Sequence, residues 1–122
     1  MTAREAIERV DTLKYNQFTT REKLGWLQSL EWQIKAEIVD GHEDDFMENP
    51  AYLSEDTMDA DLLARPPYDD MYLKWLEAQI DYHNGEFDRY NNSIALFQTA
   101  FDGYKNFYHR HHMPLGAKIR YF

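Results

Sequence analysis

The chain has 122 residues, which suits a single domain, and a compact fold of this size buries roughly two thirds of its unfolded surface. It contains no cysteine, which excludes disulfides and thiolate metal sites, and its formal net charge is −9. Because nucleic-acid affinity comes mainly from lysine and arginine contacts to phosphates, this acidic chain is a poor candidate for a nucleic-acid-binding protein. The first ten residues, MTAREAIERV, contain no apolar run, so we expect no signal peptide, and no stretch approaches the ~20 apolar residues of a membrane span.

Two helices are predicted in the first forty residues. Thr2-x-x-Glu5 and Thr19-x-x-Glu22 both match a capping box, which predicts helices over Ala3–Leu13 and Thr20–Val39. The first helix has apolar positions at Ala6, Ile7, Val10 and Leu13, and the second at Leu24, Leu27, Leu30 or Glu31, Ile34 and Ile38. Gly41 is a plausible stop for the second helix.

The region 41–67 is predicted to be an irregular, acidic insertion. Its acids outnumber its one base, Arg65, and comprise Glu43, Asp44, Asp45, Glu48, Glu55, Asp56, Asp59 and Asp61. A loop of this length in a compact domain is usually functional or mobile, and part of it, such as 59–64, suits a short strand or turn. Pro66-Pro67 follows, and its second proline suits the first position of a helix.

A long C-terminal helical hairpin is predicted next, with helices over Pro67–His83 and Glu86–His111. The second of these carries the strongest pattern in the sequence, with apolar residues in alternating steps of three and four at Phe87, Tyr90, Ile94, Phe97, Phe101, Tyr104 and Tyr108. The first carries Tyr68, Tyr72, Leu76, Ile80 and His83 on one face. The apolar spacing of three and four residues continues without interruption from the first helix through Asn84-Gly85 into the second, so a bend in one long helix is the alternative. We favour a turn, because both residues suit helix ends.

The chain therefore predicts an all-α bundle of about four helices over 1–113, with residues 114–122 as an extended C-terminal arm. Pro114 and Gly116 end any helix there, and Lys118 to Phe122 alternates between charged and apolar residues.

Sequence motifs for catalysis or metal binding are weak. His109-Arg110-His111-His112 could supply imidazole ligands, but neighbouring helical side chains point apart, and a polar helix end explains the cluster equally well. There is no nucleophile elbow and no phosphate-binding glycine loop. We therefore predict no catalytic, cofactor or metal residues and a role that is not enzymatic.

The aromatic residues point to protein contacts. Phe87, Phe97 and Phe101 are expected to pack in the core of the chain itself. Several others fall outside the main apolar stripes, and a domain this small cannot easily cover every ring. With the apolar residues of the C-terminal arm, they form a predicted interface set: Trp26, Trp32, Trp75, Tyr82, Phe107, Pro114, Ile119, Tyr121 and Phe122.

An ordered set of motifs resembles the small head–tail connector (adaptor, head-completion) proteins of tailed bacteriophages and prophages. The shared run comprises Leu62-Leu63, Pro66-Pro67, Tyr68 with Tyr72, Leu76 to Asp81, Gly85-Glu86, Arg89 to Ser93, and Arg110 with His112 to Pro114. The N-terminal stretches REAIERVDTLKYN and REKLGWLQSLEWQIKAEI also fit, so the resemblance covers most of the chain, whereas 41–58 has no matching motif.

This resemblance implies a structural virion protein at the head–tail junction, made in the host bacterial cytoplasm. Such connectors form rings, often twelve-fold, beneath the portal protein, contact tail or stopper proteins, and let DNA pass without specific binding. Acidic surface repels phosphates, so Glu43, Asp44, Asp45, Glu48, Asp59 and Asp61 are hypothesised to face the channel or a neighbouring subunit. The alternatives are a free-standing helical interaction module without a virion role and a metal-dependent enzyme that uses the histidine cluster.

Overall fold

The structure, a computed structural model, describes residues 1–38 and 52–111 of the chain. Its α-helices are α1 (Ala3–Leu13), α2 (Thr20–Glu37), α3 (Met71–His83) and α4 (Phe87–His111), and a short 3-10 turn, η2 (Tyr68–Asp70), leads into α3. The predicted all-α class is confirmed. No helix in the described part of the chain combines the length and the apolar character needed to cross a membrane.

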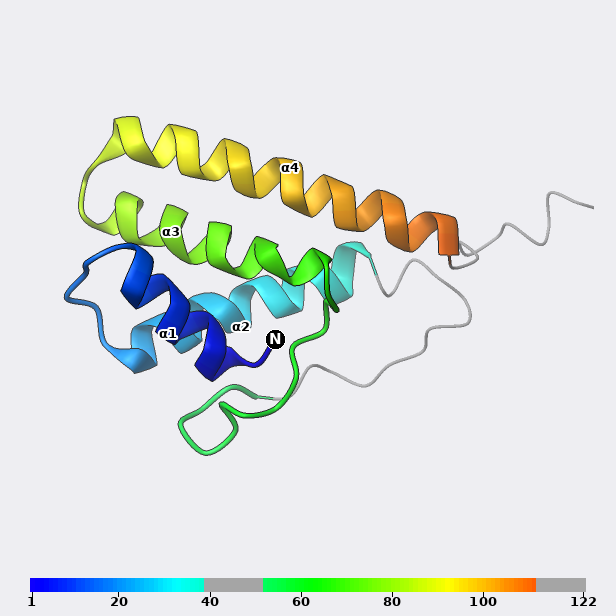
Figure 1. The fold of residues 1–122 in the computed structure, drawn as a ribbon, viewed down its shortest axis with the longest axis horizontal. Helices are drawn as coiled ribbons and strands as arrows, with labels where there is room; N and C mark the ends of the chain where they lie inside the picture. Colours follow the sequence, from blue (N-terminus) through cyan, green and yellow to red (C-terminus); the bar gives the residue numbers. More distant parts are fainter. Residues whose placement is uncertain (39–51, 112–122) are drawn as a thin grey trace, which may run out of the picture.

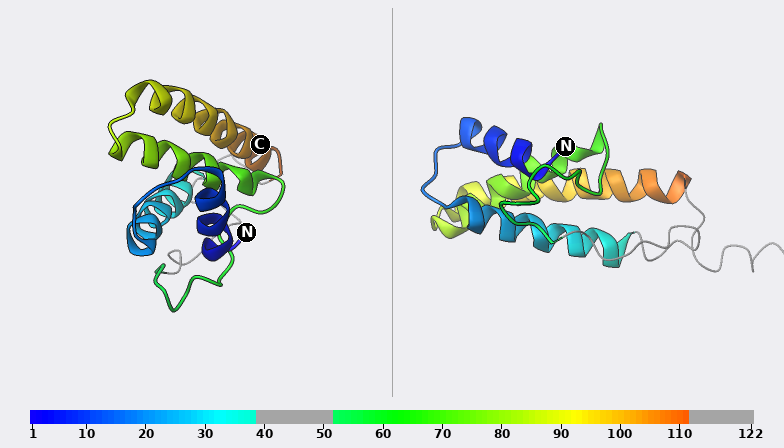
Figure 2. Two further views of the ribbon diagram at one scale, coloured as in Figure 1. Left: turned by 60° about the vertical axis from the view of Figure 1, so that its left-hand side comes forward. Right: turned by 90° about the horizontal axis from the view of Figure 1, so that it is seen from below.

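Helix α3 lies at the centre of the bundle. It packs against α4 on one side and against both α1 and α2 on the other, as Figures 1 and 2 show. Among the described elements, α4 contacts only α3 and η2, so much of its circumference has no helix beside it. The turn between α3 and α4 and the loop between α1 and α2 lie at the same end of the bundle (Figure 1), which we call the hairpin end.

The two predicted N-terminal caps, at Thr2 and Thr19, and the predicted hairpin turn are present. The Thr2 hydroxyl accepts a hydrogen bond from the Glu5 backbone N–H at 3.2 Å, and that of Thr19 accepts one from Glu22 at 3.1 Å. These bonds satisfy donors that the first turn of a helix leaves without a partner. Gly85 has a φ of 73°, a left-handed conformation that ends α3 and lets the chain reverse into α4.

The core forms from the predicted apolar faces of all four helices. Its buried side chains include Val10, Leu27, Ile34, Leu76 and Phe97, together with Phe101, Tyr104 and Tyr108 from the aromatic stripe of α4. Two core predictions were wrong: Leu13 is 63% exposed and Phe87 is 58% exposed. Both lie in a terminal turn of their helix, where no described element covers most of the side chain.

Three predicted boundaries also need correction. Pro67 precedes η2 rather than occupying the first position of α3, which begins at Met71. Helix α4 begins at Phe87 instead of Glu86, and α2 ends at Glu37, while Val39 lies outside the described residues.

Residues 52–67, the described part of the predicted irregular segment, are turns and bends that pack against the bundle. Of the two expectations for 59–64, a short strand or a turn, the structure has turns and bends, and the segment makes one isolated antiparallel bridge, between Thr2 and Asp61. Backbone N–H groups of the segment donate to the side chain of Gln28 (2.6 Å) and to the Met1 carbonyl (3.0 Å). Four of its side chains join the core: Leu53, Met58, Leu62 and Ala64. This part of the loop is therefore held firmly by α1, α2 and α3.

Candidate protein-interaction site

A continuous group of aromatic rings covers the hairpin end of the bundle. Trp26 stacks on His83 with ring centroids 4.9 Å apart, and Phe18 meets Trp26 edge-on at 5.2 Å. Tyr82 lies edge-on to His83 at 5.3 Å and continues the group to the rings of α4. We call this group the hairpin-end aromatic surface, and its members are Phe18, Trp26, Tyr82, His83, Phe87 and Tyr90.

Two chain reversals assemble this surface. The cap at Thr19 starts α2 directly after Phe18, and about two turns later α2 presents Trp26. The turn at Gly85 brings the start of α4 beside the end of α3, so Tyr82 lies 6.1 Å from the ring of Phe87 and 5.3 Å from that of Tyr90.

The outer part of the surface is open to solvent. Tyr82 is 50% exposed and Phe87 is 58% exposed, whereas Phe18 and Trp26 are half-buried against the core. The Nδ1 of His83 lies 2.8 Å from the Gln79 carbonyl, and because a carbonyl can only accept, the proton is on Nδ1. The rings are thus fixed from below and offer their edges and faces outward, as aromatic residues of protein interfaces do.

The structure brings some predicted interface residues together and separates others. Trp75 lies beneath the surface: its indole N–H donates to the Trp26 carbonyl at 2.7 Å, and its ring packs on Phe97 at 4.9 Å. Phe107 lies near the other end of α4, where it stacks on Tyr68 at 4.6 Å. Trp32 is 43% exposed on α2, in none of these ring contacts. Of the predicted set, Trp26 and Tyr82 belong to the surface, and Trp75 supports it.

The remaining predicted interface and channel residues lie mostly outside the described part of the chain. This applies to Pro114, Ile119, Tyr121 and Phe122 and to Glu43, Asp44, Asp45 and Glu48. Asp59 and Asp61 are both exposed, and Asp59 accepts a hydrogen bond from Arg4 at 2.7 Å. That hydrogen bond lowers the pKa of Asp59 below its ordinary value.

Sequence reasoning missed Phe18, His83 and Phe87 as members of this surface. The residue spacing placed His83 on one face of the third helix with Tyr72, Leu76 and Ile80, and Phe87 was expected to pack in the core. Their positions in the sequence could have indicated them. Each residue lies at or next to a predicted helix end, where a neighbouring helix often does not cover an apolar side chain.

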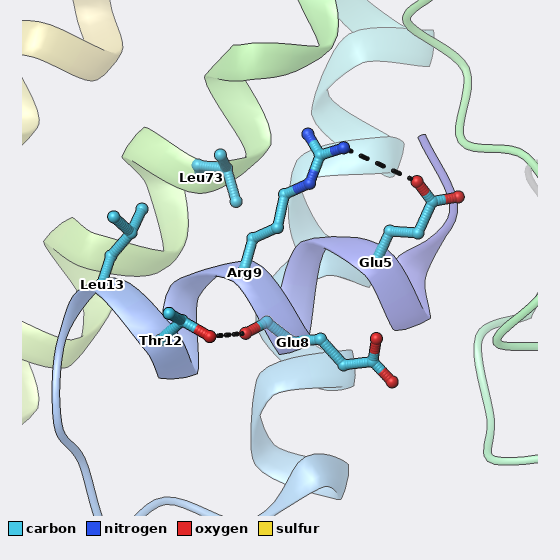
Figure 3. Close-up of a pocket in the computed structure, with 6 residues that line it drawn as sticks. All are labelled: Glu5, Glu8, Arg9, Thr12, Leu13 and Leu73. Atoms are coloured by element: carbon cyan, nitrogen blue, oxygen red, sulfur yellow. Dashed lines mark hydrogen bonds and ion pairs between the residues drawn. The ribbon is translucent and has the colours of Figure 1, made fainter.

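A groove lies between α1 and α3, with a volume of about 460 Å³ (Figure 3). Leu13 and Leu73 provide its apolar wall. Arg9 forms an ion pair with Glu5 at 3.9 Å along one side, and the Glu8 side chain points away from the two leucines. This groove offers apolar contact area, but it contains none of the predicted interface residues.

Two buried carboxylates hold the bundle together. The fully buried carboxylate of Asp81 in α3 accepts hydrogen bonds from the ammonium of Lys14 at 2.7 and 2.8 Å and from the hydroxyl of Ser93 in α4 at 2.7 Å. These contacts join the loop after α1, helix α3 and helix α4 at one point, directly below the hairpin end.

The second buried carboxylate belongs to Glu31 in α2. It accepts a hydrogen bond from the Tyr72 hydroxyl at 2.5 Å and one from the Leu63 backbone N–H at 2.9 Å, and the Ala64 N–H donates to Tyr72 at 2.9 Å. Burial raises the pKa of Glu31 above its ordinary value, and burial together with the nearby Glu31 raises that of Tyr72. The cluster pins residues 63–64 between α2 and α3, which is a structural role.

No three histidine or acidic side chains converge on a possible metal position within the described residues. The side chain of His111 and all of His112 lie outside that part of the chain, so the predicted alternative at 109–112 is not placed by the structure.

Searches against protein-family models, curated proteins and solved structures gave no match to this chain. The fold and the hairpin-end aromatic surface define a helical protein with a partly open aromatic face.

Proposed function

We propose that the protein is a structural subunit of the head–tail junction of a tailed bacteriophage or prophage. Identical copies form a ring beneath the portal protein and join the capsid to the tail. The observation that carries this proposal is the hairpin-end aromatic surface, with Tyr82 and Phe87 half-exposed in one connected group of rings. A ring subunit needs an apolar, aromatic face toward its neighbours, and aromatic residues are enriched in the cores of such interfaces.

Three further features support the proposal. The motifs that resemble head–tail connectors fall largely on α3 and α4, which pack against each other as a helical hairpin. The chain is acidic, with a net charge of −9, so a ring of copies lets DNA pass while repelling its phosphates. Asp59 and Asp61 are exposed, as residues facing a channel or a neighbouring subunit must be.

The proposal is tested by co-producing the chain with the portal protein of the same phage or prophage and analysing the product by native mass spectrometry and electron microscopy. A ring of identical copies on the portal, often twelve-fold in connectors, is the expected result. Chains that stay single in the presence of the portal contradict the proposal. A ring that places Asp59 and Asp61 on its outer wall would refute their channel role alone.

The matched variants for this test are Phe87→Ser and Tyr52→Ser. Both side chains are exposed, at 58% and 79%, so neither change should unfold the bundle. Only the first lies on the hairpin-end aromatic surface. We expect Phe87→Ser to reduce ring yield several-fold and Tyr52→Ser to leave it unchanged, with equal circular dichroism spectra for both.

A further inference from the structure

Carboxylates border the hairpin-end aromatic surface. Glu22 precedes Trp26 by one turn on the same side of α2, and Glu86 and Asp88 flank Phe87 at the start of α4. Glu86 forms an ion pair with Arg89 at 3.3 Å, so the negative character of this border comes mainly from Glu22 and Asp88. The surface therefore combines exposed rings with a negative border, which suits a partner segment carrying both apolar and cationic side chains.

One segment of the chain has this composition. Its last eleven residues, HMPLGAKIRYF, contain the cations Lys118 and Arg120 interleaved with Ile119, Tyr121 and Phe122, and they contain no acid. In a chain with a net charge of −9, a segment with two cations and no acid is complementary in charge to the border of the aromatic surface.

The length of this segment favours docking on another copy. It follows His111, the last residue of α4, whereas Phe87 is the first residue of the same 25-residue helix. A helix of that length spans about 37 Å. Ile119 follows His111 by eight residues, a fully extended span of at most about 29 Å, so Ile119 falls short of the aromatic surface of its own copy. A second copy imposes no such limit.

We infer that the C-terminal segment of one copy, residues 114–122, docks on the hairpin-end aromatic surface of a second copy. The cations lie against the rings and the bordering carboxylates, and the apolar side chains cover Tyr82 and Phe87. This inference rests on the proposed function, because it names the contact by which neighbouring copies in the ring meet. Such a contact joins two different patches, and repeated contacts of this kind close into a ring when the rotation permits.

The absence of native cysteine allows a direct test by disulfide trapping in the full chain. Purified Phe87→Cys and Tyr121→Cys variants are mixed under mild oxidation over a series of concentrations, and the mixed dimer is measured by mass spectrometry. The matched control replaces Phe87→Cys with Tyr52→Cys, a position that is at least as exposed and is not one of the rings of the hairpin-end aromatic surface. We expect the mixed dimer with Phe87→Cys to exceed the control several-fold, and the excess to disappear when Lys118 and Arg120 are both changed to Glu.

Two results would overturn the inference. One is an equal yield of mixed dimer for Phe87→Cys and Tyr52→Cys at every concentration. The other is a double variant, Phe87→Cys with Tyr121→Cys, that closes only within single chains, because the segment would then dock on its own copy. The proposed function and the docking contact can be refuted independently. If trapping is preferential but no ring forms on the portal, the proposed function is refuted and the docking contact stands. If a portal-bound ring forms without preferential trapping, only the docking contact is refuted.

Discussion

Replacing Lys14 with methionine tests whether the buried carboxylate of Asp81 depends on its ion pair. The substitution keeps the apolar stem of the side chain and removes the ammonium that lies 2.7 and 2.8 Å from the two carboxylate oxygens. Only the Ser93 hydroxyl then remains among the three contacts, and Asp81 is fully buried. Removing one partner of a buried ion pair costs about 3–5 kcal/mol in general.

The lower end of that range applies here, because the Lys14 side chain is 25% exposed and water can partly solvate the site. We therefore expect Lys14→Met to lower the free energy of unfolding by about 3 kcal/mol. For a domain of this length, that loss lowers the melting temperature by roughly 10–15 °C. Urea unfolding followed by circular dichroism measures the change. An unaltered slope of the unfolding free energy against urea concentration shows that the unfolded states of the two proteins are comparable.

Two further variants separate the lost ion pair from other causes. Lys74→Met, on the same helix as Asp81 but outside this cluster, should change stability by less than about 0.5 kcal/mol. Adding Asp81→Asn to Lys14→Met removes the buried charge and should recover much of the lost stability. A cost of Lys14→Met no larger than that of Lys74→Met, or no recovery in the double variant, would refute the reasoning.

Three more predictions concern the Glu31 cluster and the glycines. Burial raises the pKa of Glu31 above its ordinary value of 4.5, so its contribution to stability is complete below that pH and is lost as pH rises through the folded-state pKa. The free energy of unfolding of the native chain, relative to that of Glu31→Gln, should therefore fall as pH rises. Urea titrations in which this difference grows with pH would contradict the prediction. Tyr72→Phe removes the hydroxyl that bridges Glu31 and the Ala64 N–H and should cost about 2–3 kcal/mol in urea unfolding, whereas a neutral effect would show that water replaces it. Gly85→Ala should cost about 1 kcal/mol, because its φ is 73°. Gly25→Ala lies within α2, where an added Cβ meets no atom within 4 Å beyond the adjoining residues and the backbone of that helix, and it should stabilise by a similar amount. Thermal melts that shift in the same direction for both variants would refute the distinction.

Local signals predicted most of the secondary structure. Thr2 and Thr19 marked helix starts because their hydroxyls satisfy backbone donors in the first turn, and Asn84-Gly85 marked a turn because glycine adopts positive φ without strain. Wrong predictions occurred at Leu13 and Phe87. Periodicity identifies the apolar side of a helix, but it does not show where the covering helix ends.

The candidate surface was predictable only in part. Tyr82 and Trp26 were identified because they fall outside the apolar stripes, whereas Phe18, His83 and Phe87 were missed. The structure shows why: residues from α2, α3 and α4 meet only after two chain reversals bring three helix ends together.

By itself, the sequence determined the all-α class, the positions of four helices, the acidic charge and the absence of cysteine, because each depends on composition or on residues a few positions apart. Only the tertiary structure decided which aromatic rings become neighbours and which stay open to solvent. It also decided that Lys14, Asp81 and Ser93 form one buried cluster, although 67 positions separate the first two. Such contacts depend on how whole helices pack around α3, and the spacing of residues within a single helix does not encode that packing.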